Sequence, residues 1–242
     1  MKDPTKAVIG VSEHFYSLQG EGPEEGYPAV FLRTKGCTLD CVFCDTTAVW
    51  KTGKVMKIKE LLNLFDTSGY IEHLRCGAIL VLTGGSPLLH QDSLTLFLSA
   101  LASAIAPAFL HVSVETEGVL MPSKEFSAFV STWIVSPKLS SSLQPLKNRL
   151  KPEVLKWHAK SANVMTYFKY VIGSIDDFAE MANQTSEFKI RQSSVWLMPK
   201  ASTREQLQGN WAAETLPTLC KANYYRYSNR LHVQLWDKTT GV

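Results

Sequence analysis

Three cysteines lie close together near the start of the chain, and their spacing is that of a set of metal ligands. Cys37, Cys41 and Cys44 form the pattern C-x3-C-x2-C directly after a predicted strand. Thiolates are the usual ligands of iron–sulfur clusters, and a cubane cluster of four irons normally takes four of them. With three protein ligands, one iron keeps open positions for another molecule. The spacing therefore indicates a catalytic iron–sulfur cluster.

A structural zinc site and a chance grouping of inert thiols are the two alternatives to a cluster. Zinc prefers four tetrahedral ligands, so a fourth ligand would have to come from His14, His73, His90 or Cys76. The spacing is not a usual zinc pairing, and we favour the cluster. Cys76 and Cys220, outside the triad, are expected to be buried structural thiols.

Glycines and polar residues follow several predicted strands at the points where these strands end. The segment Leu80–Pro87 reads as a buried strand and a Gly-Gly-Ser-Pro turn, and its glycines let the backbone approach a ligand closely. Glu115, Ser136 and Lys138 end the next two predicted units. In β/α folds, side chains at the carboxyl ends of strands face the active site, although a plain turn or a solvated acid would look the same.

A second group of residues suits the binding of a small anion. Arg33 lies on the strand before the cysteines, where its guanidinium could bind a carboxylate with two hydrogen bonds or form a surface salt bridge. Thr46 follows Cys44 and Asp45, and its hydroxyl is a candidate ligand for Mg²⁺, which prefers oxygen. The segment Phe15–Pro23 ends in a Gly-Glu-Gly turn.

The elements that position these residues follow from the hydrophobic periodicity. The sequence predicts strands at Val8–Tyr16, Ala29–Arg33, Ala78–Thr83, His111–Glu115, Thr132–Val135, Tyr167–Ile172, Val195–Met198 and Leu231–Leu235. It predicts helices at Ile58–Phe65, Asp92–Ala106, Ser123–Val130, Ile175–Asn183 and Ser202–Leu216.

Alternation of strands and helices predicts parallel strands joined by right-handed crossovers. There are about six such units, fewer than the eight of a complete barrel. Periodicity alone leaves two α/β folds open, an incomplete barrel and a doubly wound sheet. We expect the first, a partial (incomplete) β/α TIM-type barrel with about six parallel strands, the cluster in the loop after the first barrel strand, and a single domain over residues 1–242.

The composition excludes several classes of protein. The chain has 242 residues, is 45% hydrophobic and has a net charge of +3, too small a charge for a nucleic-acid platform. No apolar run approaches the roughly 20 residues of a membrane span, and no signal core follows Met1, so we expect a cytoplasmic protein that binds no membrane. Five cysteines are too few for a disulfide scaffold.

The cysteine triad resembles the hallmark of the radical S-adenosylmethionine superfamily. The resemblance implies a [4Fe–4S] cluster whose open iron is chelated by the amino and carboxylate groups of S-adenosylmethionine, which is then cleaved to an adenosyl radical. Phe43 matches the aromatic residue commonly found beside the adenine. The superfamily usually has Gly-Gly-Glu-Pro after its second strand, a motif that contacts the methionyl amino group. Here Ser86 replaces the Glu, so that backbone carbonyls or Glu115 would carry more of this contact.

Further motifs narrow the resemblance. Leu-Gln-Gly-Glu-Gly, the Arg before the triad, Cys-Asp-Thr, Ser-Pro-Lys and the Gly-Val terminus resemble the 7-carboxy-7-deazaguanine synthase family, from Glu13 to Val242. The resemblance implies ring contraction of 6-carboxy-5,6,7,8-tetrahydropterin to 7-carboxy-7-deazaguanine with loss of ammonia, a step in queuosine and deazapurine biosynthesis. It also implies dependence on Mg²⁺, an external electron donor such as a flavodoxin, and a homodimer.

The same resemblance implies a role for individual residues. The expected substrate-binding residues are Leu18, Gln19, Gly20, Glu21, Arg33, Thr83 and Val242. The expected S-adenosylmethionine-binding residues are Phe43, Asp45, Gly85, Glu115, Ser136 and Lys138. Cys37, Cys41 and Cys44 would bind the cluster, and Thr46 would bind Mg²⁺.

Two rival functions are compatible with the cysteine spacing. A glycyl-radical-enzyme activating enzyme shares the triad and a similar length, but it acts on a protein and does not need Gln19, Glu21, Arg33 and Thr46 as a set. The second rival is a non-catalytic iron–sulfur or zinc interaction module, which would cleave no S-adenosylmethionine.

Overall fold

The structure is a computed structural model that describes residues 7–160, 165–239 and 241. Its strands form one nine-stranded sheet in the order β3-β1-β2-β4-β5-β6-β7-β8-β9. The strands are β1 (Val8–Leu18), β2 (Pro28–Thr34), β3 (Lys54–Lys57), β4 (Ile79–Gly84), β5 (Val112–Thr116), β6 (Thr132–Val135), β7 (Met165–Ile172), β8 (Val195–Pro199) and β9 (Arg226–Tyr227).

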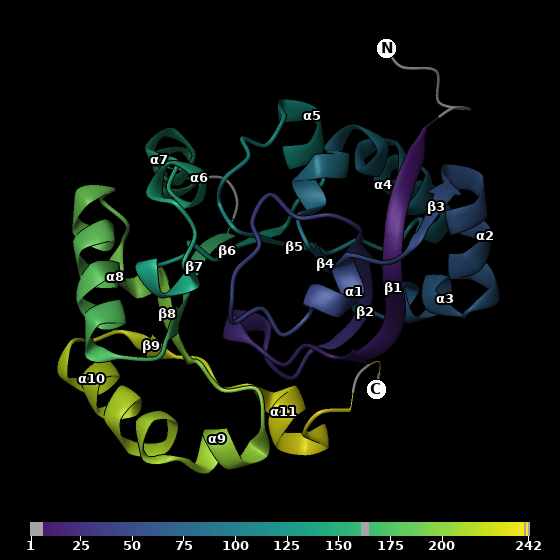
Figure 1. The fold of residues 1–242 in the computed structure, drawn as a ribbon. Coiled ribbons are helices and arrows are strands. Elements are labelled where there is room, and N and C mark those ends of the chain that lie inside the picture. The colour runs from purple at the N-terminus through teal and green to yellow at the C-terminus, as the bar shows by residue number, and fades with distance from the viewer. Residues whose placement is uncertain (1–6, 161–164, 240, 242) are drawn as a thin grey trace.

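Neighbouring strands from β2 through β9 pair in parallel, whereas β1 pairs antiparallel with both β2 and β3. All six predicted parallel strands, from Ala29–Arg33 to Val195–Met198, are therefore confirmed. The sheet curves around a central space with most of its helices outside, and β3 and β9 do not meet (Figure 1). The fold is the predicted incomplete barrel and not a doubly wound sheet.

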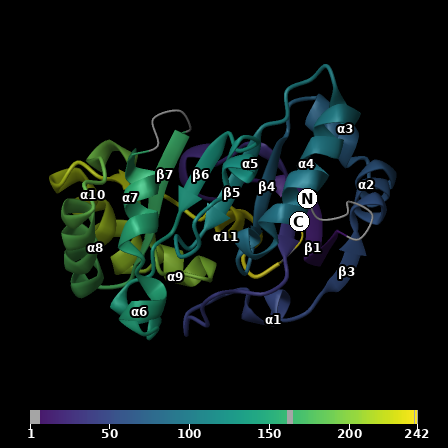
Figure 2. The ribbon, with the colours of Figure 1, turned by 90° about the horizontal axis from the view of Figure 1, so that it is seen from above.

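The α-helices follow most of the predicted periodicity. They are α1 (Thr47–Trp50), α2 (Ile58–Thr67), α3 (Tyr70–Arg75), α4 (Gln91–Ile105), α5 (Lys124–Ser127), α6 (Leu146–Arg149), α7 (Pro152–Lys160), α8 (Ile175–Glu187), α9 (Arg204–Gln208), α10 (Leu216–Ala222) and α11 (Leu231–Trp236). Figure 2 shows α1 and the loop before it at one end of the sheet, where the parallel strands have their carboxyl ends. The sequence predicts the site at these carboxyl ends of the strands.

Two predictions near the carboxyl terminus are wrong. Leu231–Leu235, predicted as a strand, is helix α11; β9 already pairs with β8, and Val233 is the residue that this short helix buries. The predicted helix Ser202–Leu216 is divided into α9, a π-helical turn at Trp211–Thr215, and α10, which continues beyond Pro217 because proline is tolerated in the first turn of a helix.

The segment Pro87–Ile105 differs from the expectation of no long apolar run. It forms a helical stretch of 19 residues with a mean hydropathy of 1.2, which by length and composition alone would suffice to cross a membrane. In the fold it is a core helix, because one face of α4 is buried against the sheet and its neighbours: Leu94, Phe97, Leu98, Leu101 and Ile105.

The curved sheet has two faces of different character. We call the convex face, which packs on the helices, the outer face, and the concave face the inner face. On β4, Leu80 and Leu82 belong to the large core with the helices, whereas Ile79 and Val81 belong to a small cluster with Phe31 of β2. Since alternate strand residues point to opposite faces, Thr83 shares the inner face with Val81.

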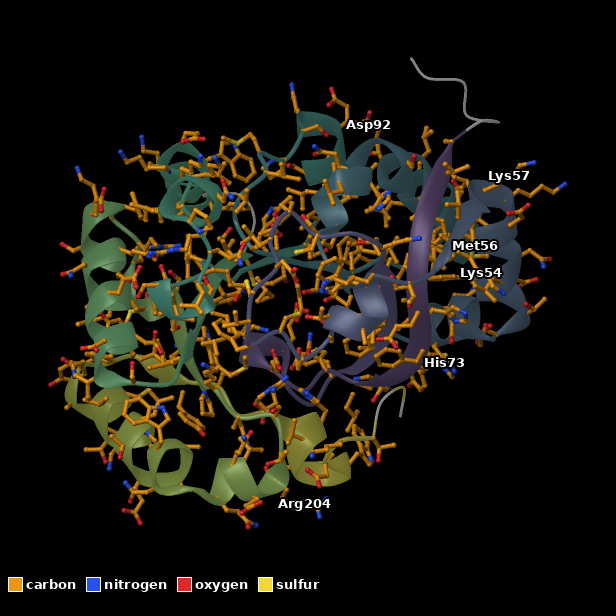
Figure 3. The ribbon with its side chains drawn as sticks, viewed as in Figure 1. Lys54, Met56, Lys57, His73, Asp92 and Arg204 are labelled. Carbon is orange, nitrogen blue, oxygen red and sulfur yellow. The ribbon has the colours of Figure 1, made fainter. Side chains whose placement is uncertain are left out.

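The free edge of the sheet lies away from the central space. Figure 3 shows the labelled side chains of β3, Lys54, Met56 and Lys57, beside α2 at the outer margin of the molecule. Two lysines on an edge strand discourage pairing with another sheet. The candidate site lies on the inner face instead, at the carboxyl ends of the parallel strands.

Candidate functional site

A cavity of about 760 Å³ opens at the carboxyl ends of the parallel strands. It is lined by all of the predicted site residues that the structure describes: Leu18, Gln19, Gly20, Glu21, Arg33, Cys37, Cys41, Phe43, Cys44, Asp45, Thr46, Thr83, Gly85, Glu115, Ser136 and Lys138. Val242 lies outside the described residues, and Gly241 borders the cavity. Their roles remain proposals, but the fold brings them to one place.

The cysteine loop rests directly on the glycine turn after β4. An added Cβ on Gly85 would lie 1.9 Å from the carbonyl oxygen of Gly36, so only glycine allows this approach. The amide of Ser86 donates to the same carbonyl at 2.8 Å. Gly84 has a φ of +134° and lies against Thr34, which also favours glycine. The Gly-Gly pair therefore fixes the cysteine loop to the sheet.

The three cysteines of this loop are free and half-buried, and all face the cavity. Burial raises the pKa of Cys37 to about 11 and also raises the pKa of Cys41. Burial works in the same direction at Cys44, but hydrogen bonds with Thr47 and Thr46 lower its pKa overall. The thiols are thus sheltered from water while remaining open to the cavity.

The donor set fits a cluster better than a zinc ion. In the described part of the chain, no three His, Cys, Asp or Glu side chains are placed to hold one metal ion. The thiolates of a cluster need not converge in this way, because each binds a different iron. The proposed fourth zinc ligands are also engaged elsewhere: His14 contacts the hydroxyl of Tyr70 at 3.0 Å, and His90 contacts the carbonyl of Lys35 at 2.8 Å.

The other candidate zinc ligands lie on the outside of the barrel. His73 stacks on Tyr16 with 3.8 Å between ring centroids, and Figure 3 places it near β1 and α3, away from the cysteine loop at the centre. Cys76 is exposed, so its prediction as a buried thiol is wrong: it follows α3 in a turn and not within the strand. Cys220 is buried in the core, as predicted.

A buried network of charges forms the wall of the cavity next to β1. Glu21 binds Lys169 at 2.5 Å and the Nε of Arg230 at 2.9 Å. Burial alone would raise the pKa of Glu21, but the charges of Lys169, Arg230 and His232 lower it below its ordinary value. Burial likewise opposes the charge of Lys169, whose pKa is nevertheless raised by Glu115 and Glu21. Glu21, Lys169 and Arg230 are therefore all charged near neutral pH.

Arg230 connects this network to the cysteine loop. It donates from one terminal nitrogen to Asp45 at 2.5 Å and from the other to the carbonyl of Ala201 at 2.6 Å. The amide of Leu231 donates to the carbonyl of Gly20 at 2.8 Å, which draws α11 across the open side of the barrel toward β1 (Figure 1). The carboxyl-terminal segment thus closes the site.

Sequence analysis missed both Lys169 and Arg230. A lysine inside the apolar strand Met165–Ile172 is a signal, because a charged residue among buried neighbours usually has a partner. Arg230 offers no such signal, since its partners Glu21 and Asp45 are distant in the sequence.

Arg33 points into the cavity with one side already held. Its Nε donates to Glu13 of β1 at 2.6 Å, and both side chains line the cavity. On the neighbouring strands, Thr83 donates to Glu115 at 2.7 Å, and the side-chain amide of Gln19 lies 3.5 Å from the other oxygen of Glu115. These contacts fix a guanidinium and a group of hydrogen-bonding side chains on the inner face.

On the cluster side, Lys138 donates to the carbonyl and the hydroxyl of Ser136, both at 2.9 Å. The ammonium of Lys200 lies 4.9 Å from the centroid of the Phe43 ring. Thr46 precedes α1 without capping it by a side-chain hydrogen bond, and its hydroxyl lies 3.6 Å from the sulfur of Cys44.

Ser86 does not line the cavity. It is fully buried, and its hydroxyl donates to Glu117 at 2.8 Å. Glu117 follows β5 and does line the cavity. Ser86 thus stands where the superfamily usually has a glutamate, and its hydroxyl donates to the carboxylate of Glu117.

Comparisons with known proteins identify the family. The profile of the Radical SAM superfamily matches residues 31–131. The chain is 31% identical to the 7-carboxy-7-deazaguanine synthase of Halobacterium salinarum, over 95% of this chain and 91% of the relative. It is 33% identical to the enzyme of the same name from Rhodopirellula baltica, over 98% of this chain and 90% of the relative. The chain belongs to the 7-carboxy-7-deazaguanine synthase family.

Solved structures support the fold of this family member. The crystal structure of QueE from Escherichia coli superposes with a TM-score of 0.69 at 21% identity, covering 95% of this chain and 96% of that one. A structure of Streptococcus suis SuiB bound to the precursor peptide SuiA gives a TM-score of 0.56 at 14% identity, over 85% of this chain and 49% of that one. Membership of the 7-carboxy-7-deazaguanine synthase family gives the chain a [4Fe–4S] cluster and S-adenosylmethionine as cofactors.

Proposed function

We infer that this chain converts 6-carboxy-5,6,7,8-tetrahydropterin to 7-carboxy-7-deazaguanine with release of ammonia, a step in queuosine biosynthesis. The observation that supports this best is the single cavity in which the cysteine triad, Arg33 and the buried Glu21 network face one another. Such a cavity suits a small substrate held close to a cluster, in a chain related to synthases of this name over almost its whole length.

The cysteines Cys37, Cys41 and Cys44 would hold the cluster, which together with S-adenosylmethionine supplies the one-electron chemistry that removes a hydrogen atom from the substrate. The protein has to hold the substrate and keep water away while the ring rearranges. Glu21, Lys169 and Arg230 form ion pairs with one another in the wall of the cavity. Their charges are therefore compensated by the protein and do not have to be hydrated.

Arg33 is the proposed partner of the substrate carboxylate. Its Nε is held by Glu13, which orients the guanidinium at the wall of the cavity. A guanidinium binds a carboxylate most strongly through two parallel hydrogen bonds. An Arg33 oriented by Glu13 would hold the substrate carboxylate, and with it the ring, in one position within the cavity.

The remaining substrate contacts involve the pterin ring, whose amide and amino groups are hydrogen-bond donors. Gln19, Thr83 and Glu115 form a connected group of side chains on the inner face, and Leu18, Gly20 and Glu21 line the cavity beside them. We assign these residues to the ring, together with Val242. The polar groups among them would also receive the ammonia that the reaction releases.

The second ligand group, proposed for S-adenosylmethionine, lies on the cluster side of the cavity. It consists of Phe43, Asp45, Gly85, Glu115, Ser136 and Lys138. Thr46, whose hydroxyl does not cap α1, is the proposed Mg²⁺ ligand; Mg²⁺ held there would help Arg33 to bind the substrate carboxylate.

The decisive experiment is anaerobic reconstitution of the full chain, followed by addition of 6-carboxy-5,6,7,8-tetrahydropterin, S-adenosylmethionine, Mg²⁺ and a reductant. We expect 7-carboxy-7-deazaguanine and ammonia. Cleavage of S-adenosylmethionine without this product would exclude the synthase and favour an activating enzyme for a glycyl-radical protein. No cleavage by a fully loaded cluster would favour a non-catalytic module.

Replacement of Arg33 tests the carboxylate site. Arg33→Ala should raise KM for the pterin about a hundredfold, because a charge-assisted pair is lost, and leave the absorption spectrum of the cluster intact. Arg33→Lys, which keeps the charge but not the fork, should raise KM less. An unchanged KM for Arg33→Ala would remove Arg33 from this role.

We further propose a homodimer that works as a single-domain enzyme in the cytoplasm and takes its electron from a donor such as a flavodoxin. The family resemblance supports the dimer and the donor, and five free cysteines suit a reducing compartment. Light scattering should give a mass of twice 27.0 kDa, and cell fractionation should recover the protein without membranes.

A further inference from the structure

Glu117 is a buried carboxylate that faces the cavity without a cationic partner in the described part of the chain. Only 5% of its surface is exposed. Its Oε1 accepts hydrogen bonds from Thr38 at 2.5 Å and from Ser86 at 2.8 Å, and its Oε2 lies 3.5 Å from the hydroxyl of Thr116. All of these partners are neutral hydroxyls, which do not compensate a buried negative charge.

The other acidic groups of the cavity are paired differently. Four of them have a cationic partner: Glu13 binds Arg33, Glu21 binds Lys169 and Arg230, Glu115 lies 3.5 Å from Lys169, and Asp45 binds Arg230. Asp237, which also lines the cavity, is exposed to solvent. An uncompensated buried charge destabilises a fold unless a partner binds to it. The contrast indicates that the partner of Glu117 is a ligand that enters the cavity.

The position of Glu117 defines which part of a ligand it meets. Thr38, which donates to it, is the residue after Cys37, and Ser86 follows Gly85, which lies against Gly36 of the cysteine loop. Both donors therefore fix the carboxylate of Glu117 beside the cysteine loop. S-adenosylmethionine, a cofactor of the family, would meet Glu117 here if its methionyl end lies at the cluster, as the family resemblance implies.

We propose that Glu117 accepts a hydrogen bond from the amino group of S-adenosylmethionine and that Ser86 positions it. The amino group is the hydrogen-bond donor of the methionyl end. A short hydroxyl at Ser86 supplies no charge, but it holds the carboxylate of the next strand at the place where charge is required. Ser86 in the turn after β4 thus positions the carboxylate of Glu117 and has no negative charge of its own.

The proposal rests on the proposed function only in that the chain binds a cluster and S-adenosylmethionine. Equilibrium dialysis of the anaerobically reconstituted protein, without Mg²⁺ or pterin, measures the Kd for S-adenosylmethionine in each variant. Omission of Mg²⁺ ensures that a weaker Kd does not arise through a magnesium site.

Glu117→Gln keeps the shape of the side chain and removes its charge. It should raise the Kd for S-adenosylmethionine at least tenfold, whereas the matched control Glu125→Gln, at an exposed position on α5, should leave the Kd unchanged. Binding of 5′-methylthioadenosine, which lacks the amino acid part, should be equal in both variants and in the wild type. Iron content and the absorption spectrum verify that the cluster is present.

Two outcomes would overturn the proposal: an unchanged Kd for S-adenosylmethionine in Glu117→Gln, or an equal loss of both ligands. If Glu117→Gln fails to hold a cluster, Ser86→Ala decides, because it keeps the charge and removes one positioning donor. Ser86→Ala should raise the Kd for S-adenosylmethionine about threefold and not that for 5′-methylthioadenosine; equal values would contradict the proposal. A wild type that binds no S-adenosylmethionine would instead overturn the proposed function.

Discussion

The outer and inner faces of the sheet are made by the same strands, but the outer face packs an apolar core and the inner face lines a polar cavity. On the outer face, Leu80 and Leu82 of β4 are fully buried against helices. On the inner face, Thr83 of β4, Glu115 of β5 and Lys169 of β7 line the cavity and bind one another. Since neighbouring residues of a strand point to opposite faces, stability and ligand binding can be separated one residue at a time.

The largest contrast is expected between two cysteines. Cys41→Ala removes a cluster ligand on the cavity side, and it should abolish product formation and reduce bound iron to a small fraction. Cys220→Ala, in the outer core, should retain iron and activity and lower the free energy of unfolding by about 1 kcal/mol. Iron analysis and urea unfolding measure both effects. A Cys41→Ala variant with full iron and activity would contradict the assignment of the cluster.

Lys169 tests whether the inner face also contributes to stability. Lys169→Met leaves Glu21 buried beside Arg230 alone and should lower the free energy of unfolding by about 4 kcal/mol. The double variant Glu21→Gln/Lys169→Met should recover part of the loss, because Glu21 is then neutral and Arg230 keeps Asp45 as its partner. Urea unfolding of both variants measures this, and additive losses would show that the pair is not coupled.

Leu82 and Thr83 are adjacent residues on opposite faces of β4, so substitutions at these two positions compare the faces directly. Leu82→Ala should lower the free energy of unfolding by about 3 kcal/mol and leave KM unchanged, because it opens a cavity in the outer core. Thr83→Val should change stability by less than about 1 kcal/mol and reduce kcat/KM about tenfold, since Glu115 loses the nearest of its donors. A large KM effect for Leu82→Ala would mean that the faces are not independent.

The smallest effect concerns a polar residue on the outer side. His158 is buried between Trp133 and Trp157, and neither ring nitrogen has a hydrogen-bond partner in the described part of the chain. Burial lowers its pKa from 6.5 to about 3. The unfolded chain therefore takes up the proton first, and stability falls as the pH drops from 6.5 toward 3.

Between pH 7 and pH 5 this group should reduce the free energy of unfolding by about 2 kcal/mol. His158→Leu should remove that part of the pH dependence, which is measured by comparing urea midpoints of the two proteins at both pH values. An equal pH dependence in wild type and variant would show that His158 does not contribute.

Strands with strong apolar runs were predictable, and short or exposed elements were not. The barrel strands β2 and β4 to β8 are apolar runs bounded by turns, and all appear in the structure. β9 has two residues, too few for a periodic signal, and β3 is largely exposed. At Leu231–Leu235 the alternation of apolar and polar residues was misleading, because tertiary contacts decide the conformation of so short a segment.

Within the site, residues with distinctive chemistry were predictable from local spacing. The cysteines, the Gly-Gly turn and Arg33 lie next to recognisable strands, and the structure brings them to one cavity. The pairing of Ser86 with Glu117, or of Arg230 with Asp45, depends on which loops meet in three dimensions. Nothing in the local sequence specifies those contacts.

The bond between Arg230 and Asp45 has a consequence for the order in which the protein matures. The two residues are 185 positions apart, so the cysteine loop leaves the ribosome long before its anchor is made. At about 5–20 residues per second, the interval is roughly 10–40 seconds. Until translation is almost complete, the loop is held by the glycine turn and by Glu117 but lacks this last contact. A chain that ends before Arg230 would therefore carry the three cysteines in a loop that is only partly anchored.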